Sequence, residues 1–223
     1  YPEGRAFVLV EVKSALSSQP MTAGEIAVLH FDRISQDAAD VPFSAWRDDF
    51  VFVPGDKVHE TNGPSLAGGF DMTAVFDEPL AAGCSGVLAE QGDWIAGWAM
   101  YLADGVLHWV SAGFGGEDEV SAPVPDGTRL LRVQGDLLDD DVEMTVFADG
   151  TEIAASRLGR PMPLVWAPDG AFLTVGHARP FPVTDRMPLD IPAPDSMRSL
   201  RIRTGPPPEI DPQEEFDRVM RHQ

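Results

Sequence analysis

Two apolar, aromatic-rich runs meet at the dipeptide Asp104-Gly105 in the middle of the chain. They read Gly-Trp-Ala-Met-Tyr-Leu-Ala over residues 97–103 and Val-Leu-His-Trp-Val over residues 106–110. An Asp-Gly pair between such runs is a strong signal for a β-hairpin, because a type I′ turn needs two residues that tolerate positive φ. The sequence therefore predicts antiparallel strands around this turn and an all-β fold class.

The same pattern recurs along the chain. Phe70–Phe76 and Val142–Ala148 alternate apolar and polar residues, which is typical of strands with one buried and one solvated face. Further turns are predicted at Asp126-Gly127, Asp149-Gly150 and Asp169-Gly170. Strands joined by turns roughly every 20 residues favour two antiparallel sheets that pack face to face.

The first 61 residues are predicted to form a β leader or the first strands of the sandwich. Ala6–Val12, Glu25–Phe31 and Asp48–Pro54 each have the composition of a strand. Residues 62–205 would then form the sandwich itself.

Residues 206–223 are expected to form a proline-rich linker and a C-terminal helix. Asp211 suits the N-cap, and Pro212 suits the first helical position. Phe216 and Met220 would share one apolar stripe, and a helix this short does not persist alone in water. The two side chains are therefore candidate contacts with the sandwich or with another subunit.

Charge excludes several classes of partner. The chain has 36 acidic and 16 basic residues, a formal charge of −20, so nucleic acid and anionic membranes are repelled. No apolar run reaches the ~20 residues that span a bilayer, so no membrane insertion is expected. The single cysteine, Cys84, excludes an intrachain disulfide. A cytoplasmic location is favoured, and a cleaved signal peptide before Tyr1 stays open.

No catalytic residue emerges from the motifs. The five histidines do not fall at metal-ligand spacing, and no Gly-X-Ser-X-Gly motif is present. Glu117-Asp118-Glu119 is the nearest approach to paired glycosidase carboxylates, but we expect it in a glycine-rich turn rather than a strand. No cofactor is expected, and Ca²⁺ at this cluster or at Asp139-Asp140-Asp141 is the alternative.

Aromatic side chains concentrate between residues 94 and 109. Trp98 and Tyr101 differ in parity along one strand, so they should face opposite sides of the sheet. Core packing is expected for most of these rings, and an exposed ring would serve a protein interface or a sugar platform. The candidate ligand or partner contacts are Trp94, Trp98, Trp109 and His108, the last expected to face solvent or a sheet edge.

Several motifs recur in the order and spacing of one known family. They are Gly86-Val-Leu-Ala-Glu-Gln-Gly-Asp-Trp94, the run over residues 97–109, Pro123-Val-Pro-Asp-Gly127, Gly159-Arg-Pro-Met-Pro163 and Val175-Gly-His-Ala-Arg-Pro-Phe-Pro-Val-Thr-Asp185. On these motifs, residues 63–223 resemble the C-terminal region of bacterial arylsulfatases. The resemblance implies a concanavalin A-like jelly-roll sandwich of two antiparallel sheets, here with a short β leader and a C-terminal helix.

The catalytic features of that family do not carry over. A sulfatase of this kind needs a Cys-X-Pro-X-Arg type motif, and Cys84-Ser-Gly-Val-Leu88 has neither the proline nor the arginine. We therefore expect a non-catalytic accessory or stabilising subunit that packs on a catalytic partner or a larger assembly, or a homo-oligomer. The alternatives are a lectin-like carbohydrate-binding module, and the distal domain of a sulfatase-like or amidase-like hydrolase with its active site on another segment.

Overall fold

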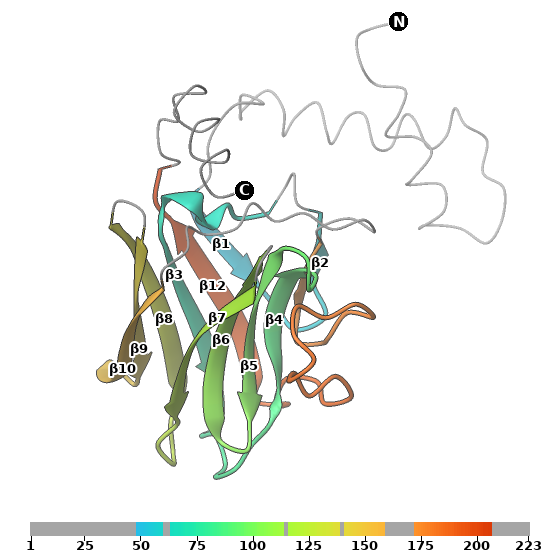
Figure 1. Cartoon of the computed structure of the whole chain (residues 1–223). Coiled ribbons are helices and arrows are strands. Elements are labelled where there is room, and N and C mark those ends of the chain that lie inside the picture. The colour runs from blue at the N-terminus through green and yellow to red at the C-terminus, as the bar shows by residue number, and fades with distance from the viewer. Residues whose placement is uncertain (1–47, 60–62, 114–115, 139–140, 159–171, 207–223) are drawn as a thin grey trace, which may run out of the picture. The chain divides into compact units, whose positions relative to one another are not determined.

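The computed structural model describes residues 48–59, 63–113, 116–138, 141–158 and 172–206. They form two six-stranded antiparallel sheets packed face to face (Figure 1), which confirms the predicted all-β, concanavalin A-like jelly-roll sandwich. The strands expected before residue 47, the Asp169-Gly170 turn and the C-terminal helix with Phe216 and Met220 lie outside the described residues. Within the described part of the chain, no helix has the length and apolarity needed to cross a membrane.

Sheet A has one buried face and one solvated face. Its strands alternate buried and more exposed residues, as the sequence predicted for residues 70–76 and 142–148. In spatial order they are β1 (Asp49–Phe52), β12 (Met197–Thr204), β3 (Phe70–Phe76), β8 (Leu130–Leu138), β9 (Asp141–Ala148) and β10 (Thr151–Leu158).

Sheet B is buried on both faces over its central strands. Every residue of β4 and all but the last of β5 are buried, so the unbroken apolar run over residues 97–103 reflects cover on two sides. In spatial order the strands are β2 (Lys57–Val58), β11 (Leu173–Val175), β4 (Gly86–Gly92), β5 (Gly97–Ala103), β6 (Val106–Gly113) and β7 (Gly116–Pro123).

Two of the predicted Asp-Gly hairpins are confirmed. Asp104 and Gly105 have φ of 50° and 77° and join β5 to β6, while Asp149 and Gly150 have φ of 47° and 81° and join β9 to β10. Positive φ at both turn residues is the geometry of the type I′ turn.

The sandwich begins before residue 62. β1 pairs with β12 at the edge of sheet A, and β2 pairs with β11 at the edge of sheet B. Residues 49–58 therefore belong to the sheets, which agrees with the alternative that this part of the chain holds the first strands of the sandwich. The two edge strands are short, and the sequence did not show which later strands they would pair with.

The main core lies between the sheets. Trp98 and Trp109 are fully buried there, and Trp109 stacks on Phe70 with ring centroids 5.3 Å apart. The indole N–H of Trp98 donates a hydrogen bond of 3.1 Å to Oε1 of Gln91, which satisfies the polar end of a large buried ring.

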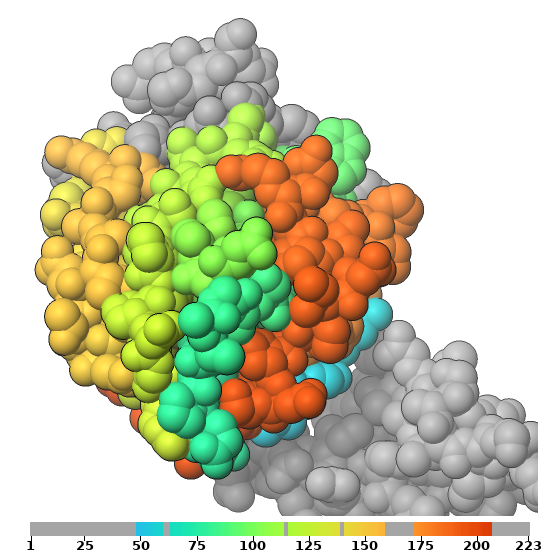
Figure 2. All heavy atoms as spheres, turned by 90° about the horizontal axis from the view of Figure 1, so that it is seen from below, coloured from blue at the N-terminus to red at the C-terminus, as the bar shows by residue number. Residues whose placement is uncertain are grey.

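A long loop between β11 and β12 covers the outer face of sheet B. We call residues 176–196 the covering loop; it is part of the orange segment packed against the green strands in Figure 2. Val183 and Met187 of this loop close a second apolar cluster with side chains of β4, β5 and β6, among them Tyr101. Trp98 and Tyr101 thus face opposite sides of the sheet, as their parity predicted, and both are buried.

A β-bulge in β4 turns a carboxylate toward the covering loop. The register of β4 against β5 shifts between Val87 and Ala89, so Glu90 lies opposite Ala99 on the outer face rather than on the core face. Glu90 has no exposed surface, and its carboxylate accepts hydrogen bonds from the backbone N–H groups of Arg179 and Val183. Burial raises the pKa of Glu90 to about 7, although these hydrogen bonds oppose the rise.

Candidate functional site

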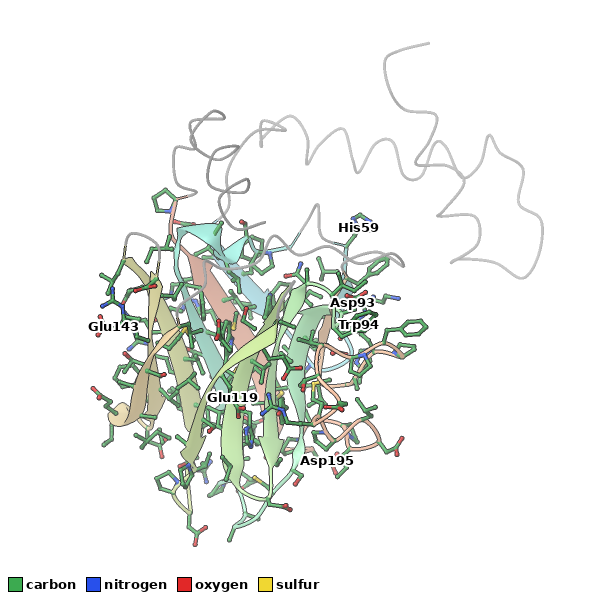
Figure 3. The ribbon with its side chains drawn as sticks, in the orientation of Figure 1. His59, Asp93, Trp94, Glu119, Glu143 and Asp195 are labelled. Atoms are coloured by element: carbon green, nitrogen blue, oxygen red, sulfur yellow. The ribbon has the colours of Figure 1, made fainter. Side chains whose placement is uncertain are left out.

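The turn between β4 and β5 presents one exposed tryptophan. Asp93 is buried, and its Oδ1 accepts hydrogen bonds from the backbone N–H groups of Ile95 at 2.8 Å and Ala96 at 3.4 Å. This Asx-type geometry fixes the turn and leaves the Trp94 side chain 65% exposed at its tip (Figure 3). Gly92 permits the tight turn because a Cβ there would lie 2.2 Å from the Ala96 carbonyl oxygen.

Trp94 borders a pocket of about 610 Å³. Three segments far apart in the sequence build it, namely the turn at Trp94 and Ile95, the facing ends of β6 and β7, and the covering loop. Its lining residues are Trp94, Ile95, Gly113, Gly116, Glu117, Thr184 and Asp185. The volume falls in the range of sites that hold a small ligand.

The polar wall of the pocket is held by an ion-pair network. Oε2 of Glu117 lies 2.6 Å from Nη2 of Arg186 and accepts a hydrogen bond of 3.3 Å from the Thr184 hydroxyl. Arg186 also donates from Nη1 to Oε2 of Glu119. Since Oε1 of Glu119 lies 2.5 Å from Nδ1 of His108, one chain of contacts runs from β6 through β7 to the covering loop.

The network shifts the acid–base behaviour of its members. Burial alone would raise the pKa of Glu119, but hydrogen bonds from His108 and Arg186 outweigh it and leave that pKa below its usual value. Burial opposes the charge of Arg186 as well, yet its two carboxylate partners hold the pKa of the guanidinium above its usual value. Arg186 is thus a fixed cation whose charge is already matched within the protein.

The expectation that Glu117-Asp118-Glu119 lies in a turn is wrong. These residues begin strand β7, which pairs with β6 in continuous register from Gly116 to Pro123. Their alternation places Glu117 and Glu119 on one face, where both contact Arg186. The sequence missed this because the two glycines of Gly115-Gly116 suggested a longer loop.

Two of the candidate tryptophans do not reach the surface. Trp98 and Trp109 have 0% exposed area, and a ring without exposed surface cannot stack on a sugar or a partner. His108 is largely covered; its ring stacks on Tyr101 with centroids 4.8 Å apart, and its side chain is 21% exposed. Burial raises the pKa of Tyr101 to about 12, so that phenol stays neutral beneath the loop. Of the candidates in the described residues, Trp94 alone presents a largely exposed ring.

Sequence reasoning missed Phe181 and the residues that the covering loop brings to the pocket. Phe181 is 57% exposed and stands between two prolines in a segment with no strand or helix pattern. Arg179 donates to the Gly92 carbonyl at 2.6 Å, and Val183 packs beside Gly97, so this segment lies along the turn that carries Trp94. The Pro-Phe-Pro run over residues 180–182 was the signal that the sequence offered.

The ligand chemistry of the described pocket is that of hydrogen-bond acceptors beside an aromatic ring. The carboxylates of Glu117 and Asp185 accept and do not donate when ionised. Among the described residues, no three His, Cys, Asp or Glu side chains gather to hold a metal ion. At the second predicted acidic cluster, Asp139 and Asp140 lie outside the described residues and Asp141 pairs with Arg157 at 2.7 Å.

No protein-family model and no curated protein sequence match this chain. Among solved structures, the CBM40 of the Ruminococcus gnavus IT-sialidase aligns with a TM-score of 0.47 and 10% identity over 78% of this chain and 96% of that one. The receptor-binding domain of botulinum neurotoxin D aligns with a TM-score of 0.41 and 10% identity, covering 81% of this chain and 45% of that chain. Domains LG4-5 of the mouse laminin alpha1 chain give 0.41 and 15%, covering 70% and 38%. Because these TM-scores and identities are low, the fold assignment rests on the strand order and register of the described residues.

Proposed function

We propose that this protein is a non-catalytic carbohydrate-binding module whose site is the pocket beside Trp94. The observation that carries the proposal is the exposed indole of Trp94 at the rim of a pocket lined by carboxylates. A sugar ring has an apolar C–H face that packs on an aromatic ring, and hydroxyl groups that donate to carboxylate oxygens. The pocket offers both kinds of partner, and the hydrogen bonds of Asp93 hold the turn that carries Trp94, which lowers the ordering cost of binding.

The described pocket is better suited to recognition than to catalysis. Glu117 and Asp185 are its ionisable lining residues, and the nearby hydroxyl of Thr184 is already committed as a donor to Glu117. A glycosidase needs one carboxyl group to protonate the leaving group and a second carboxylate to attack the sugar or activate water, whereas here Oε2 of Glu117 is engaged by Arg186 and Thr184. We therefore assign the described pocket a recognition role.

Tryptophan fluorescence gives a direct test, because the described tryptophans divide into one exposed ring and two buried rings. Titration with a binding glycan, first identified on a glycan array, should shift or quench emission in the wild-type chain. The variant Trp94→Ala should lose binding at least tenfold, as measured by isothermal titration calorimetry. The matched control is Val51→Ala, which removes an exposed apolar side chain from sheet A, away from the pocket.

Binding by Trp94→Ala at wild-type affinity, or an array with no bound glycan, would refute the proposal. Equal losses in the Trp94 and Val51 variants would also count against it, because they would indicate a general effect on the fold.

An accessory role in a protein assembly is the second candidate. Three large apolar side chains of the covering loop are exposed, namely Phe181 at 57%, Leu189 at 45% and Ile191 at 45%. Exposed apolar residues of this kind favour contact with another protein surface when they are contiguous. Native mass spectrometry of the full chain tests this role, and a monomer at all concentrations would exclude the homo-oligomer.

The relation to arylsulfatases remains a proposal based on the sequence motifs. It would make the module the distal domain of a hydrolase whose active site lies elsewhere. A Cys-X-Pro-X-Arg motif in the same or a neighbouring reading frame would support it, and its absence from both would reduce the resemblance to shared fold.

A further inference from the structure

We infer that the pocket beside Trp94 selects glycans that carry no acidic group, and that amino sugars and neutral sugars are its ligand class. The inference rests on the proposed function and adds the charge of the ligand to it. The juxtaposition that carries it is two carboxylates in the pocket wall, Glu117 and Asp185, beside the Arg186 guanidinium, which is already paired with Glu117 and Glu119.

The carboxylates of the pocket can accept further hydrogen bonds. Oε2 of Glu117 serves both Thr184 and Arg186, whereas the described residues provide no partner for its Oε1. Asp185 is exposed and adds a second carboxylate to the lining. A ligand that enters therefore meets oxygen atoms that need donors, and sugar hydroxyl or ammonium groups supply them.

The nearest donors are already in use. The guanidinium of Arg186 faces Glu117 through Nη2 and Glu119 through Nη1, and its Nε points toward the Thr184 hydroxyl at 3.4 Å. The Thr184 hydroxyl in turn donates to Glu117. A carboxylate or sulfate on a sugar would have to compete with two protein carboxylates for the same guanidinium. That exchange gains little and leaves a carboxylate of the protein unpaired.

The net negative charge of the whole chain also disfavours acidic ligands. A formal charge of −20 repels anionic ligands at long range, and the two pocket carboxylates add repulsion at short range. An ammonium group gains from both, and it can also lie over the exposed Trp94 ring. We therefore expect affinity to fall in the order amino sugar, neutral sugar, acidic sugar.

The test compares glycans that share a backbone and differ in the charged group they carry. 3′-Sialyllactose and its methyl ester form an acidic and neutral pair, and triacetylchitotriose and chitotriose form a neutral and cationic pair. In 50 mM salt, calorimetry should show the acidic form of the first pair at least tenfold weaker than its neutral form, and the neutral form of the second pair weaker than its cationic form. The gap should narrow at 500 mM salt, since the repulsion is screened.

Charge-removing variants locate the cause of the selectivity. Asp185→Asn and the double variant with Glu117→Gln should bring the ratio of neutral to acidic affinity toward one. The control Glu143→Gln removes a carboxylate at the opposite side of the sandwich (Figure 3) and should leave the ratio unchanged. Asp185→Asn alters an exposed side chain, so its effect on the affinity ratio can be interpreted without any change in the ion-pair network.

The outcomes separate the two proposals. An acidic glycan bound as tightly as its neutral partner overturns the charge selectivity and leaves carbohydrate binding intact. Selectivity that survives both charge-removing variants overturns the assignment to these carboxylates. An array with no bound glycan overturns the proposed function and this inference together.

Discussion

Glu90 on β4 accepts a hydrogen bond from the backbone N–H of Arg179, a residue 89 positions later in the chain. The same carboxylate also accepts from the N–H of Val183 at 3.4 Å. One buried side chain thus fixes the stretch of the covering loop that continues into Thr184 and Asp185 of the pocket wall. The position of this wall depends on a titratable group with no exposed surface.

The pH dependence of stability follows from Glu90. Its pKa is raised to about 7 in the folded protein, whereas the unfolded chain has the ordinary value of 4.5. The folded state therefore binds more protons between these values, so the free energy of unfolding contributed by Glu90 falls as pH rises from about 4.5 to 7, by about 3 kcal/mol at most. Chemical denaturation at pH 5, 6 and 7 should show this slope, and Glu90→Gln should lose it. An unchanged slope in the variant would assign the effect to other groups.

Arg186 should act on the covering loop more than on global stability. It is 47% exposed, so its pairs with Glu117 and Glu119 contribute between about 0.2 and 1 kcal/mol to folding. The variant Arg186→Gln should raise amide hydrogen exchange at residues 184–187 while the strands stay protected. Arg157→Gln is the control, because Arg157 pairs with Asp141 at a distance from the loop. Uniform exchange across both sheets would contradict the local role.

The sequence predicted the sheets better than the site, and particular residues show why. Asp104-Gly105 and the alternation in residues 70–76 depend on local chemistry, so they identified a hairpin and a half-buried strand correctly. Glu90 appeared in an apolar strand as an ordinary polar residue, because the bulge that turns it outward has no local signature.

The candidate site depends on contacts over long separations. Thr184 and Asp185 reach Trp94 and Glu117 only because the covering loop folds back on sheet B. The positions of Trp98 and Tyr101 along β5 predict that they face opposite sides of sheet B. They do not predict that both faces of the sheet are covered. The unbroken run of apolar residues in β5 was the one available sign of that second cover.

Truncation of Trp98 should destabilise the fold far more than truncation of Trp94. Trp98→Ala removes a fully buried ring and its hydrogen bond to Gln91, so it should cost about 3–5 kcal/mol of folding free energy. Trp94→Ala removes an exposed ring and should stay within about 0.5 kcal/mol of the wild type. Urea denaturation of both variants measures the difference. A large loss in Trp94→Ala would mean that the indole supports the fold rather than a ligand.

The two Asp-Gly hairpins allow turn strain to be separated from close packing. Gly105 and Gly150 have φ of 77° and 81°, so Ala at either position should cost about 1 kcal/mol through the left-handed backbone conformation alone. A Cβ at Gly150 would meet no atom within 4 Å, whereas a Cβ at Gly105 would lie 3.0 Å from the backbone nitrogen of Gly83. Gly105→Ala should therefore cost roughly a further 1 kcal/mol, because the loop at Gly83 must move. Thermal denaturation of the two single variants measures this difference, and equal losses would show that the loop at Gly83 adapts freely.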